Sequence, residues 1–168
     1  MASGSPLPFD PIAEATRQWE ARGWSDAAPG MAAVTSVMRV HQILLGRVEE
    51  VLRPHDLTFA RYELLMLLSF TRTGSMPLSR IGARLQVHPT SITNAVDRCE
   101  AQALVRRVPH PRDRRATLAE ITPAGRELVA KATESLNHEV FTDLGLSRED
   151  VDAVVTVFAR FRSGHGDF

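Results

Sequence analysis

Residues 77–122 constrain the fold of this chain more than any other segment. Their first half contains two short stretches with apolar residues at helical spacing, separated by residues 86–88. Pro89 opens the second stretch, and proline is favoured in the first turn of a helix. We therefore predict a helix over 77–85, a tight turn and a second helix. The buried stripe of this second helix is expected to consist of Ile92, Val96, Cys99 and Ala103.

The opposite side of the second helix carries short polar side chains. Hydroxyl, amide and guanidinium groups can hydrogen-bond base edges and phosphates in a groove of duplex DNA. Small polar residues also cover solvated helices of every kind, so this pattern alone leaves DNA contact and simple exposure equally open. The candidate DNA-binding residues on this helix are Thr90, Ser91, Thr93, Asn94 and Arg98.

A basic hairpin follows the second helix. We predict strands over 104–108 and 117–121, and Pro109 and Pro111 exclude helix in the intervening segment, which includes the loop HPRDRR. Clustered positive charges repel one another, whereas a phosphate backbone neutralises them and releases its counterions. The loop therefore favours DNA binding by the whole segment, as a helix-turn-helix with a wing. Its candidate contacts are His110, Arg112, Arg114 and Arg115.

The distribution of charge along the chain supports this interpretation, although the formal net charge is zero. Residues 98–115 contain six arginines and two acids, and residues 134–152 contain six acids and one arginine. A basic face on one element and an acidic segment elsewhere is typical of nucleic-acid-binding proteins.

Apolar-striped helices are predicted on the N-terminal side of this segment. Asp10 and Pro11 indicate a helix start, as N-cap and first helical residue, and this helix should end near Gly23. A long helix over 31–53 has an apolar band wide enough to contact both its own domain and a partner. Thr58 is expected to cap a buried core helix.

Two more helices are predicted after the hairpin, one from Thr122-Pro123 to about Phe141 and one capped by Ser147. They have no obvious partner within a small winged domain, so we predict a helical dimer interface. The expected fold class is mainly α, an α+β winged helix-turn-helix lobe with a dimerisation lobe. The predicted regions are an N-terminal tail and extra helix at 1–30, a dimerisation region at 31–57 and 123–168, and a DNA-binding region at 58–122.

Several classes of protein fit the sequence poorly. It has no run of about 18 apolar residues that would cross a membrane, and its first residues do not resemble a secretory signal. The single cysteine, Cys99, excludes an internal disulfide and fits the cytoplasm, where we expect the protein. The histidines lack metal-ligand spacing, and no nucleotide-binding or nucleophile motif is present, so we predict no metal site, cofactor or catalytic residue.

The wing sequence Asp113-Arg114-Arg115, continued by residues 116–122 and Gly125, resembles the wing of the MarR family of transcriptional regulators. The family pattern is an acid, any residue, an arginine, a short strand, then Leu or Ile, Thr, two residues and Gly. The resemblance implies that Arg115 enters the minor groove, that Asp113 orients it, and that the helix from Pro89 lies in the major groove. It also implies a homodimer on palindromic operator DNA, usually a repressor released by a small aromatic ligand.

The same resemblance implies where a ligand would bind, between the dimer helices and the DNA-binding region. The N-terminal helix with Trp19 resembles the urate-responsive branch of the family, but Glu63 stands where that branch has Asp, and Ala95 where it has Arg. Trp19 is also readily explained as the anchor of a short extra helix, and His41 as an interface histidine. The candidate effector-binding residues are Trp19, His41, Arg61, Glu63 and His88.

The sequence thus predicts a homodimeric DNA-binding regulator, a repressor released by a small planar ligand. Two alternatives remain, a redox-responsive regulator acting through Cys99 and a DNA-binding protein without an effector. The position of Cys99 on a buried stripe favours a structural role for it. An enzyme that uses a crevice at Trp19 is a third and remote alternative.

Overall fold

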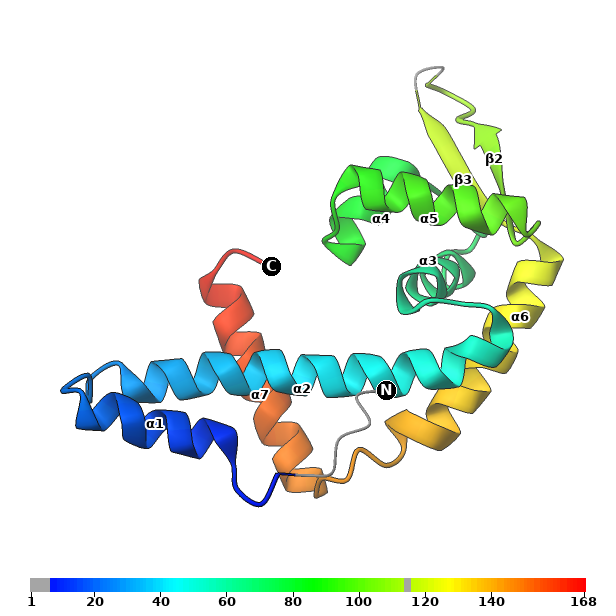
Figure 1. Ribbon diagram of the computed structural model, residues 1–168. Helices are drawn as coiled ribbons and strands as arrows, with labels where there is room; N and C mark the ends of the chain where they lie inside the picture. The colour runs from blue at the N-terminus through cyan, green and yellow to red at the C-terminus, as the bar shows by residue number, and fades with distance from the viewer. Residues whose placement is uncertain (1–6, 114–115) are drawn as a thin grey trace.

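The computed structural model describes residues 7–113 and 116–168 and is mainly helical, with one small antiparallel sheet (Figure 1). This confirms the predicted fold class. The elements are α1 (Pro11–Ala21), α2 (Ala28–Leu52), the 3₁₀ turn η1 (Arg53–His55), α3 (Phe59–Ser69), β1 (Ser75–Pro77), α4 (Leu78–Leu85), α5 (Pro89–Ala101), β2 (Val105–Pro109), β3 (Thr117–Ile121), α6 (Pro123–Leu136), the π-helical turn η2 (Asn137–Phe141) and α7 (Arg148–Gly164).

The helix starts follow from local capping. The Asp10 side chain accepts a hydrogen bond from the Ile12 amide, and Thr58 caps α3 in the same way through the Arg61 amide. Thr122 and Ser147 cap α6 and α7. The side chain of each accepts a hydrogen bond from the backbone amide three residues later, that of Gly125 and that of Asp150. All four predicted starts are confirmed, because a cap requires only residues that lie within one helical turn.

The structure differs from the sequence predictions in four respects. The long helix begins at Ala28 rather than at residue 31, since Pro29 fits the first turn, where an amide donor is not needed. Ala103 is exposed, with a φ of 56° in the turn after α5, and Ala95 is buried in its place. The first wing strand starts at Val105 instead of Leu104.

The fourth difference is β1, which the sequence did not predict. Pro77 is the last residue of this strand and the N-cap of α4, rather than the first residue of the helix. The sheet order is β1-β3-β2, with Met76 opposite Ala119 and Val108 opposite Leu118. A three-residue edge strand is too short to produce a recognisable alternating pattern, and an edge tolerates proline.

The hydrophobic core is centred on α3. Leu64, Leu65 and Leu68 are fully buried and belong to a single cluster with residues of α2, α4, α5, the sheet and α6. The prediction of a buried core helix over this segment is therefore confirmed. Only one stripe of α3 remains partly open, and it is described with the candidate site below.

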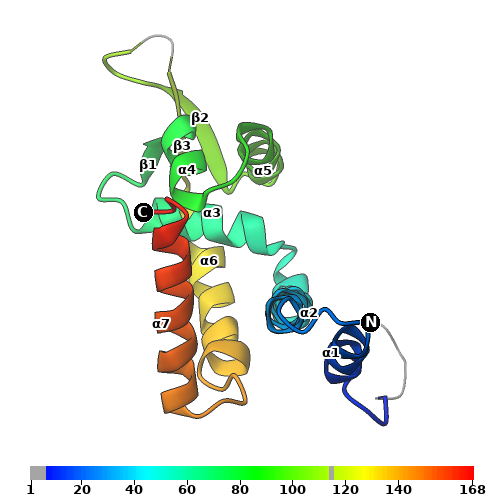
Figure 2. The same ribbon diagram turned by 90° about the vertical axis from the view of Figure 1, so that its left-hand side faces the viewer.

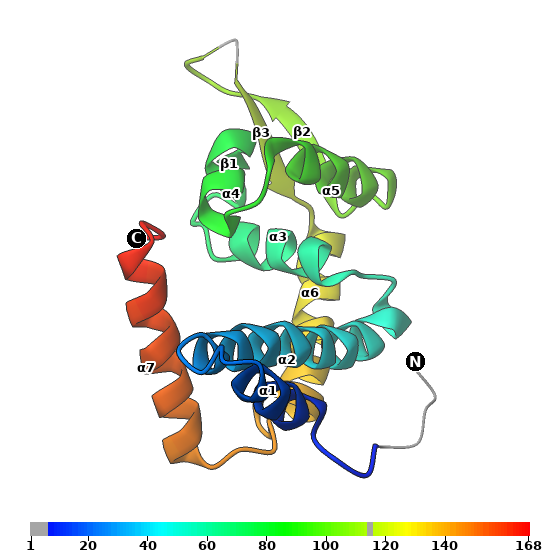
Figure 3. The same ribbon diagram turned by 60° about the vertical axis from the view of Figure 1, so that its left-hand side comes forward.

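Figures 1 and 3 show α4, α5 and the wing strands at one end of the molecule, α1 and α2 at the other, and α3 between them. The end of the chain returns to the helix-turn-helix, as Figure 2 shows for the C-terminus beside α4. There the Gln86 side-chain amide donates to the Asp167 carbonyl at 2.8 Å. The segment after α7 therefore contacts the turn between α4 and α5.

α2 and α7 leave apolar side chains open to solvent. α7 buries none of the residues that the structure describes in it, and Phe158 at its centre is 43% exposed. The other large exposed apolar residues of the two helices are Val34, Val37, Met38, Val40, Ile43, Leu44, Val154, Val155, Val157 and Phe161.

No helix in the described ranges 7–113 and 116–168 combines the length and apolar character that a membrane span requires.

Candidate nucleic-acid interface and adjoining groove

The position of α5 is set by its buried side and by the turn before it. Ile92, Val96 and Cys99 are buried in the core. Gln86 closes α4 in the left-handed conformation, and His88 caps α5 by accepting the Thr90 amide at its Nδ1. These contacts leave the remaining side of α5 at the surface.

This outer side presents the polar residues that the sequence assigned to it. All of them are exposed, and α5 lies at the end of the molecule from which the wing projects (Figure 1). The Thr93 hydroxyl donates to the Pro89 carbonyl of its own helix, so its position is fixed. The exposed residues are Thr90, Ser91, Thr93, Asn94 and Arg98.

The wing loop is ordered by His110. Its Nδ1 accepts the backbone N–H groups of Arg112, at 3.2 Å, and of Asp113, at 3.0 Å, which uses the lone pair of a neutral ring. Arg112 and Asp113 are exposed. The structure thus gives His110 a part in shaping the loop, in addition to any contact with DNA. Arg114 and Arg115, the remaining predicted wing contacts, lie outside the described residues.

Two arginines of the basic segment are held by acids rather than left free. Arg106 pairs with Glu120 across the two wing strands, at 2.6 Å. Arg107 pairs with Asp97 of α5 at 2.5 Å and with Glu100, which also accepts the Arg107 amide at 2.8 Å. These hydrogen bonds hold the pKa of the Glu100 carboxyl below its usual range. The count of arginines along the sequence therefore overstates the charge available to a nucleic acid.

The five candidate effector residues do not meet in one cavity of this chain. Trp19 packs edge-to-face on Trp24, with ring centroids 5.3 Å apart. His41 is exposed on α2, and His88 lies in the turn before α5.

Arg61 and Glu63 leave α3 on different sides. Arg61 is buried and donates to the Gln102 side chain at 2.7 Å, with Asp56 also nearby, so it joins the start of α3 to the end of α5. Glu63 instead lines an open groove. The two residues therefore cannot both belong to one small ligand site within a single chain.

The groove at Glu63 has a volume of about 370 Å³ and is mainly aromatic and aliphatic. α3 supplies most of its wall, with the tip of α4 and the turn η2 as the other sides. This groove was not predicted from the sequence, although its α3 residues recur at helical spacing. Its lining residues are Phe59, Tyr62, Glu63, Met66, Leu67, Phe70, Leu85 and Phe141.

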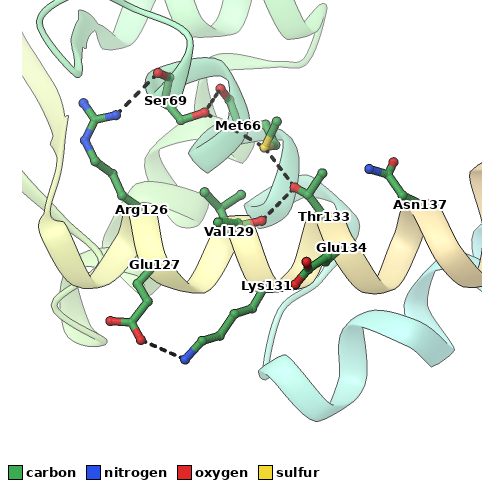
Figure 4. A pocket seen from close by; sticks show the side chains of 10 residues that line it. Met66, Ser69, Arg126, Glu127, Val129, Lys131, Thr133, Glu134 and Asn137 are labelled. Carbon is green, nitrogen blue, oxygen red and sulfur yellow. Dashed lines mark hydrogen bonds and ion pairs between the residues drawn. The ribbon is translucent and has the colours of Figure 1, made fainter.

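A second groove, of about 670 Å³, lies along α6 beside α3 (Figure 4). Most of its polar groups are already paired within the chain. Lys131 pairs with Glu127 at 2.8 Å, Arg126 donates to the Ser69 carbonyl, and the Thr133 hydroxyl bonds the Val129 carbonyl. This groove contains none of the predicted site residues, and its satisfied groups offer little to a ligand.

Cys99 is fully buried on the inner side of α5. Burial raises the pKa of its thiol to about 11, although the nearby Arg61 partly opposes the shift. A thiol in this environment is held in its protonated and unreactive form.

Comparison with known proteins places this architecture among transcriptional regulators. The MarR family profile matches residues 55–116. The chain is 47% identical to Sco5413, a MarR family transcriptional regulator from Streptomyces coelicolor, over 83% of this chain and 97% of that one, with a TM-score of 0.77.

Two further similarities are more limited. An uncharacterized HTH-type transcriptional regulator of Bacillus subtilis, YhbI, is 35% identical over 51% of this chain and 54% of its own length. The chain thus matches little more than half the length of the curated relatives. CouR, a transcriptional repressor solved bound to a 23-mer DNA duplex, is 22% identical over 75% of this chain and 89% of that one. Its TM-score of 0.69 shows that the two chains share a fold.

Proposed function

The chain belongs to the MarR family of winged helix-turn-helix transcriptional regulators, and from that membership we propose that it is a homodimeric repressor that binds palindromic operator DNA and is released by a small aromatic or planar ligand. The proposed division is a dimerisation region at 31–57 and 123–168 and a DNA-binding region at 58–122, preceded by an extra helix.

One observation supports DNA binding above all others. α5, whose polar side is exposed, lies with the wing at the end of the molecule opposite α1 and α2 (Figures 1 and 3). In this arrangement α5 enters the major groove with Ser91 and Asn94 near base edges, while the wing follows the adjoining backbone. Arg98 and Arg112, both exposed, supply phosphate contacts. Asp113, Arg114 and Arg115 complete the proposed wing contact.

The exposed apolar sides of α2 and α7 support the homodimer. Exposed apolar surface of this extent, on two long helices, is costly in water and is characteristic of a protein interface. A two-fold dimer of these helices sets two copies of α5 about one DNA turn apart, which is the spacing that a palindromic operator requires.

Release by a ligand follows from this geometry. The ligand would bind between the dimer helices and the DNA-binding region. If it binds more tightly to a dimer in which the two α5 helices have a different separation, it weakens DNA binding to the extent of that difference in affinity. Of the candidate effector residues, Glu63 is the best placed, because it lines the groove between α3, α4 and η2. Trp19, His41, Arg61 and His88 are weaker candidates, since none of them borders this groove.

An unbiased selection of bound duplex DNA tests the proposal. We expect the full-length chain to select a palindrome, and Asn94→Ala or Ser91→Ala to change the selected sequence more than the affinity for random DNA. Arg115→Ala should weaken binding to the selected site while leaving the dimer folded. Selection of no sequence by the wild type would refute the proposal, and an unchanged affinity of the Arg115 variant would refute the wing assignment.

The ligand is tested in the same selection, repeated with a panel of planar aromatic compounds. Release of the selected DNA, together with a raised melting temperature of the protein, is the expected response to an effector. A chain that binds its operator equally well with every compound would support the alternative of an effector-independent regulator.

A further inference from the structure

We propose that the groove at Glu63 binds an organic cation with an aromatic or apolar body, and that the Glu63 carboxylate pairs with the positive group. This inference rests on the proposed ligand-released function, and it names the chemical class of the ligand.

The stripe of α3 that contains Glu63 is built as one wall of a binding site. Phe59, Glu63, Met66 and Phe70 follow one another at intervals of four, three and four residues, which places them on one side of the helix. The rings of Phe59 and Tyr62 stack with centroids 6.2 Å apart. Glu63 therefore lies between aromatic groups rather than at a polar edge.

The other walls come from distant parts of the chain. Leu85 at the end of α4 and Phe141 of η2 border the groove, so the DNA-binding and helical regions both contribute to it. Phe70 is 77% exposed and Phe141 is 47% exposed. Because both rings are exposed beside the groove, an aromatic ligand that binds there can cover them and remove their apolar surface from water.

Among the residues that the structure describes, Glu63 is the only charged one that borders the groove. It is half-buried, and within residues 7–113 and 116–168 its carboxylate has no hydrogen-bond or ion-pair partner. Burial accordingly raises the pKa of this carboxyl. A carboxylate that loses water without gaining a partner is costly, and a bound cation restores the lost interaction.

Arg47, which contacts the chain on either side of Phe141, is engaged elsewhere and does not pair with Glu63. Arg47 donates to the carbonyls of Glu139 and Asp143, on either side of Phe141, at 3.3 and 3.2 Å. The surrounding rings add a second reason for a positive ligand, because aromatic faces attract cations. An anionic ligand would meet the Glu63 charge with no basic side chain bordering the groove to offset it.

The test uses three probes with the same indole ring and a different charge: tryptamine, which is cationic, tryptophol, which is neutral, and indole-3-acetate, which is anionic. Binding to the full chain is measured by isothermal titration calorimetry at neutral pH. We expect tryptamine to bind about tenfold more tightly than indole-3-acetate, with tryptophol between them, as one partly screened ion pair and a cation–π contact allow. Equal affinities, a preference for the anion, or no binding of tryptamine would overturn the proposal.

Two variants and a control locate the effect. Glu63→Gln keeps the shape and removes the charge, so the preference for tryptamine should disappear, whereas Glu63→Asp should retain it in part. Glu139→Gln removes a carboxylate from an exposed position outside the groove and should leave the preference unchanged. A preference that survives Glu63→Gln would place the cation elsewhere and overturn the assignment.

The other possible occupant is a basic side chain of a second copy of the chain. In that case Glu63→Gln would weaken the dimer in sedimentation experiments, and wild-type protein would not bind tryptamine, which overturns the proposal. Failure of the proposed function is distinguished by the DNA selection. A chain that selects an operator but shows no charge preference refutes only the cation site, whereas a chain that selects no DNA refutes the function itself.

Discussion

Arg107 on β2 and Asp97 on α5 form a 2.5 Å ion pair that joins the base of the wing to the proposed recognition helix. Glu100, one turn further along α5, binds the same guanidinium and the Arg107 amide. A planar guanidinium holds its N–H donors in a fixed arrangement, so it can bridge two carboxylates with a defined geometry. Arg107 therefore fixes the position of the wing relative to α5. Its positive charge is neutralised by Asp97 and Glu100 within the protein.

The first prediction separates this positioning function from phosphate contact. Arg107→Ala should lower the free energy of unfolding by about 1 kcal/mol, as expected for a networked surface pair. It should also weaken operator binding, because the wing loses its fixed orientation. The slope of log affinity against log salt concentration should not change, since no phosphate contact is lost.

Arg112→Ala is the matched control for that variant. Arg112 is exposed in the wing loop, so its loss should leave stability unchanged and reduce the salt slope by about 0.9. Titrations of gel-shift affinity against salt distinguish the two variants. A reduced slope for Arg107→Ala would mean that Arg107 contacts DNA and would contradict the positioning role.

The second prediction concerns Gly125, in the first turn of α6. A Cβ atom there would lie 2.2 Å from the Leu104 carbonyl oxygen and 2.9 Å from Ile121 Cγ1. The wing and α6 approach so closely because Thr122 donates from both its amide and its hydroxyl to the Leu104 carbonyl. Gly125→Ala should therefore reduce the free energy of unfolding by about 3 kcal/mol, measured by urea denaturation at fixed protein concentration.

Gly30→Ala provides the comparison for Gly125→Ala. Gly30 is also in the first turn of a helix, but nothing lies within 4 Å of its added Cβ. Alanine should be neutral or stabilising there by up to about 1 kcal/mol. Equal losses in both variants would show that close approach to Leu104 is not the cause.

The third prediction tests the proposed dimer interface on α7. Phe158→Asp introduces a charge at the centre of the exposed apolar side, and should raise the dimer dissociation constant about 30-fold or more. Thr156→Asp places the same residue on the opposite, polar side and should have little effect. Sedimentation equilibrium measures both constants, and a Phe158 variant that remains as dimeric as the wild type would place the interface elsewhere.

The fourth prediction concerns Cys99 and the redox alternative. Since the pKa of its thiol is raised to about 11, only about one molecule in a thousand carries the thiolate at pH 8. Alkylation by iodoacetamide should therefore be slow in the folded protein and should reach the rate of an ordinary cysteine in urea. Rapid modification of the native protein, or loss of a peroxide response in Cys99→Ser, would favour the redox function.

The same thiol has a consequence for stability at alkaline pH. Its pKa in the unfolded chain is near the ordinary value of 9.0, and in the folded chain it is about 11. The unfolded state therefore loses its proton first as pH rises. The contribution of Cys99 to stability is complete below about pH 9 and is lost as the pH rises towards about 11.

Local sequence predicted the helix starts and the exposed side of α5. Asp10 and Ser147 cap their helices through amides two or three residues away, and the outer residues of α5 were identified from their spacing alone. Ala103 was assigned wrongly to the buried stripe, because the helix ends at Ala101 and the chain turns at positive φ. Periodicity cannot indicate where a helix stops in the absence of proline or glycine.

The sequence by itself thus determined which segments are helices and which side of α5 faces outward. It also contains the wing pattern that identifies the family. All of these features depend on residues within a few positions of one another. Only the tertiary structure decided that Arg107 positions the wing, and that Glu63 shares a groove with Leu85 and Phe141. These relationships join residues from separate elements. They depend on how the helices and sheet pack together, and packing is fixed by the whole core rather than by any one stretch of sequence.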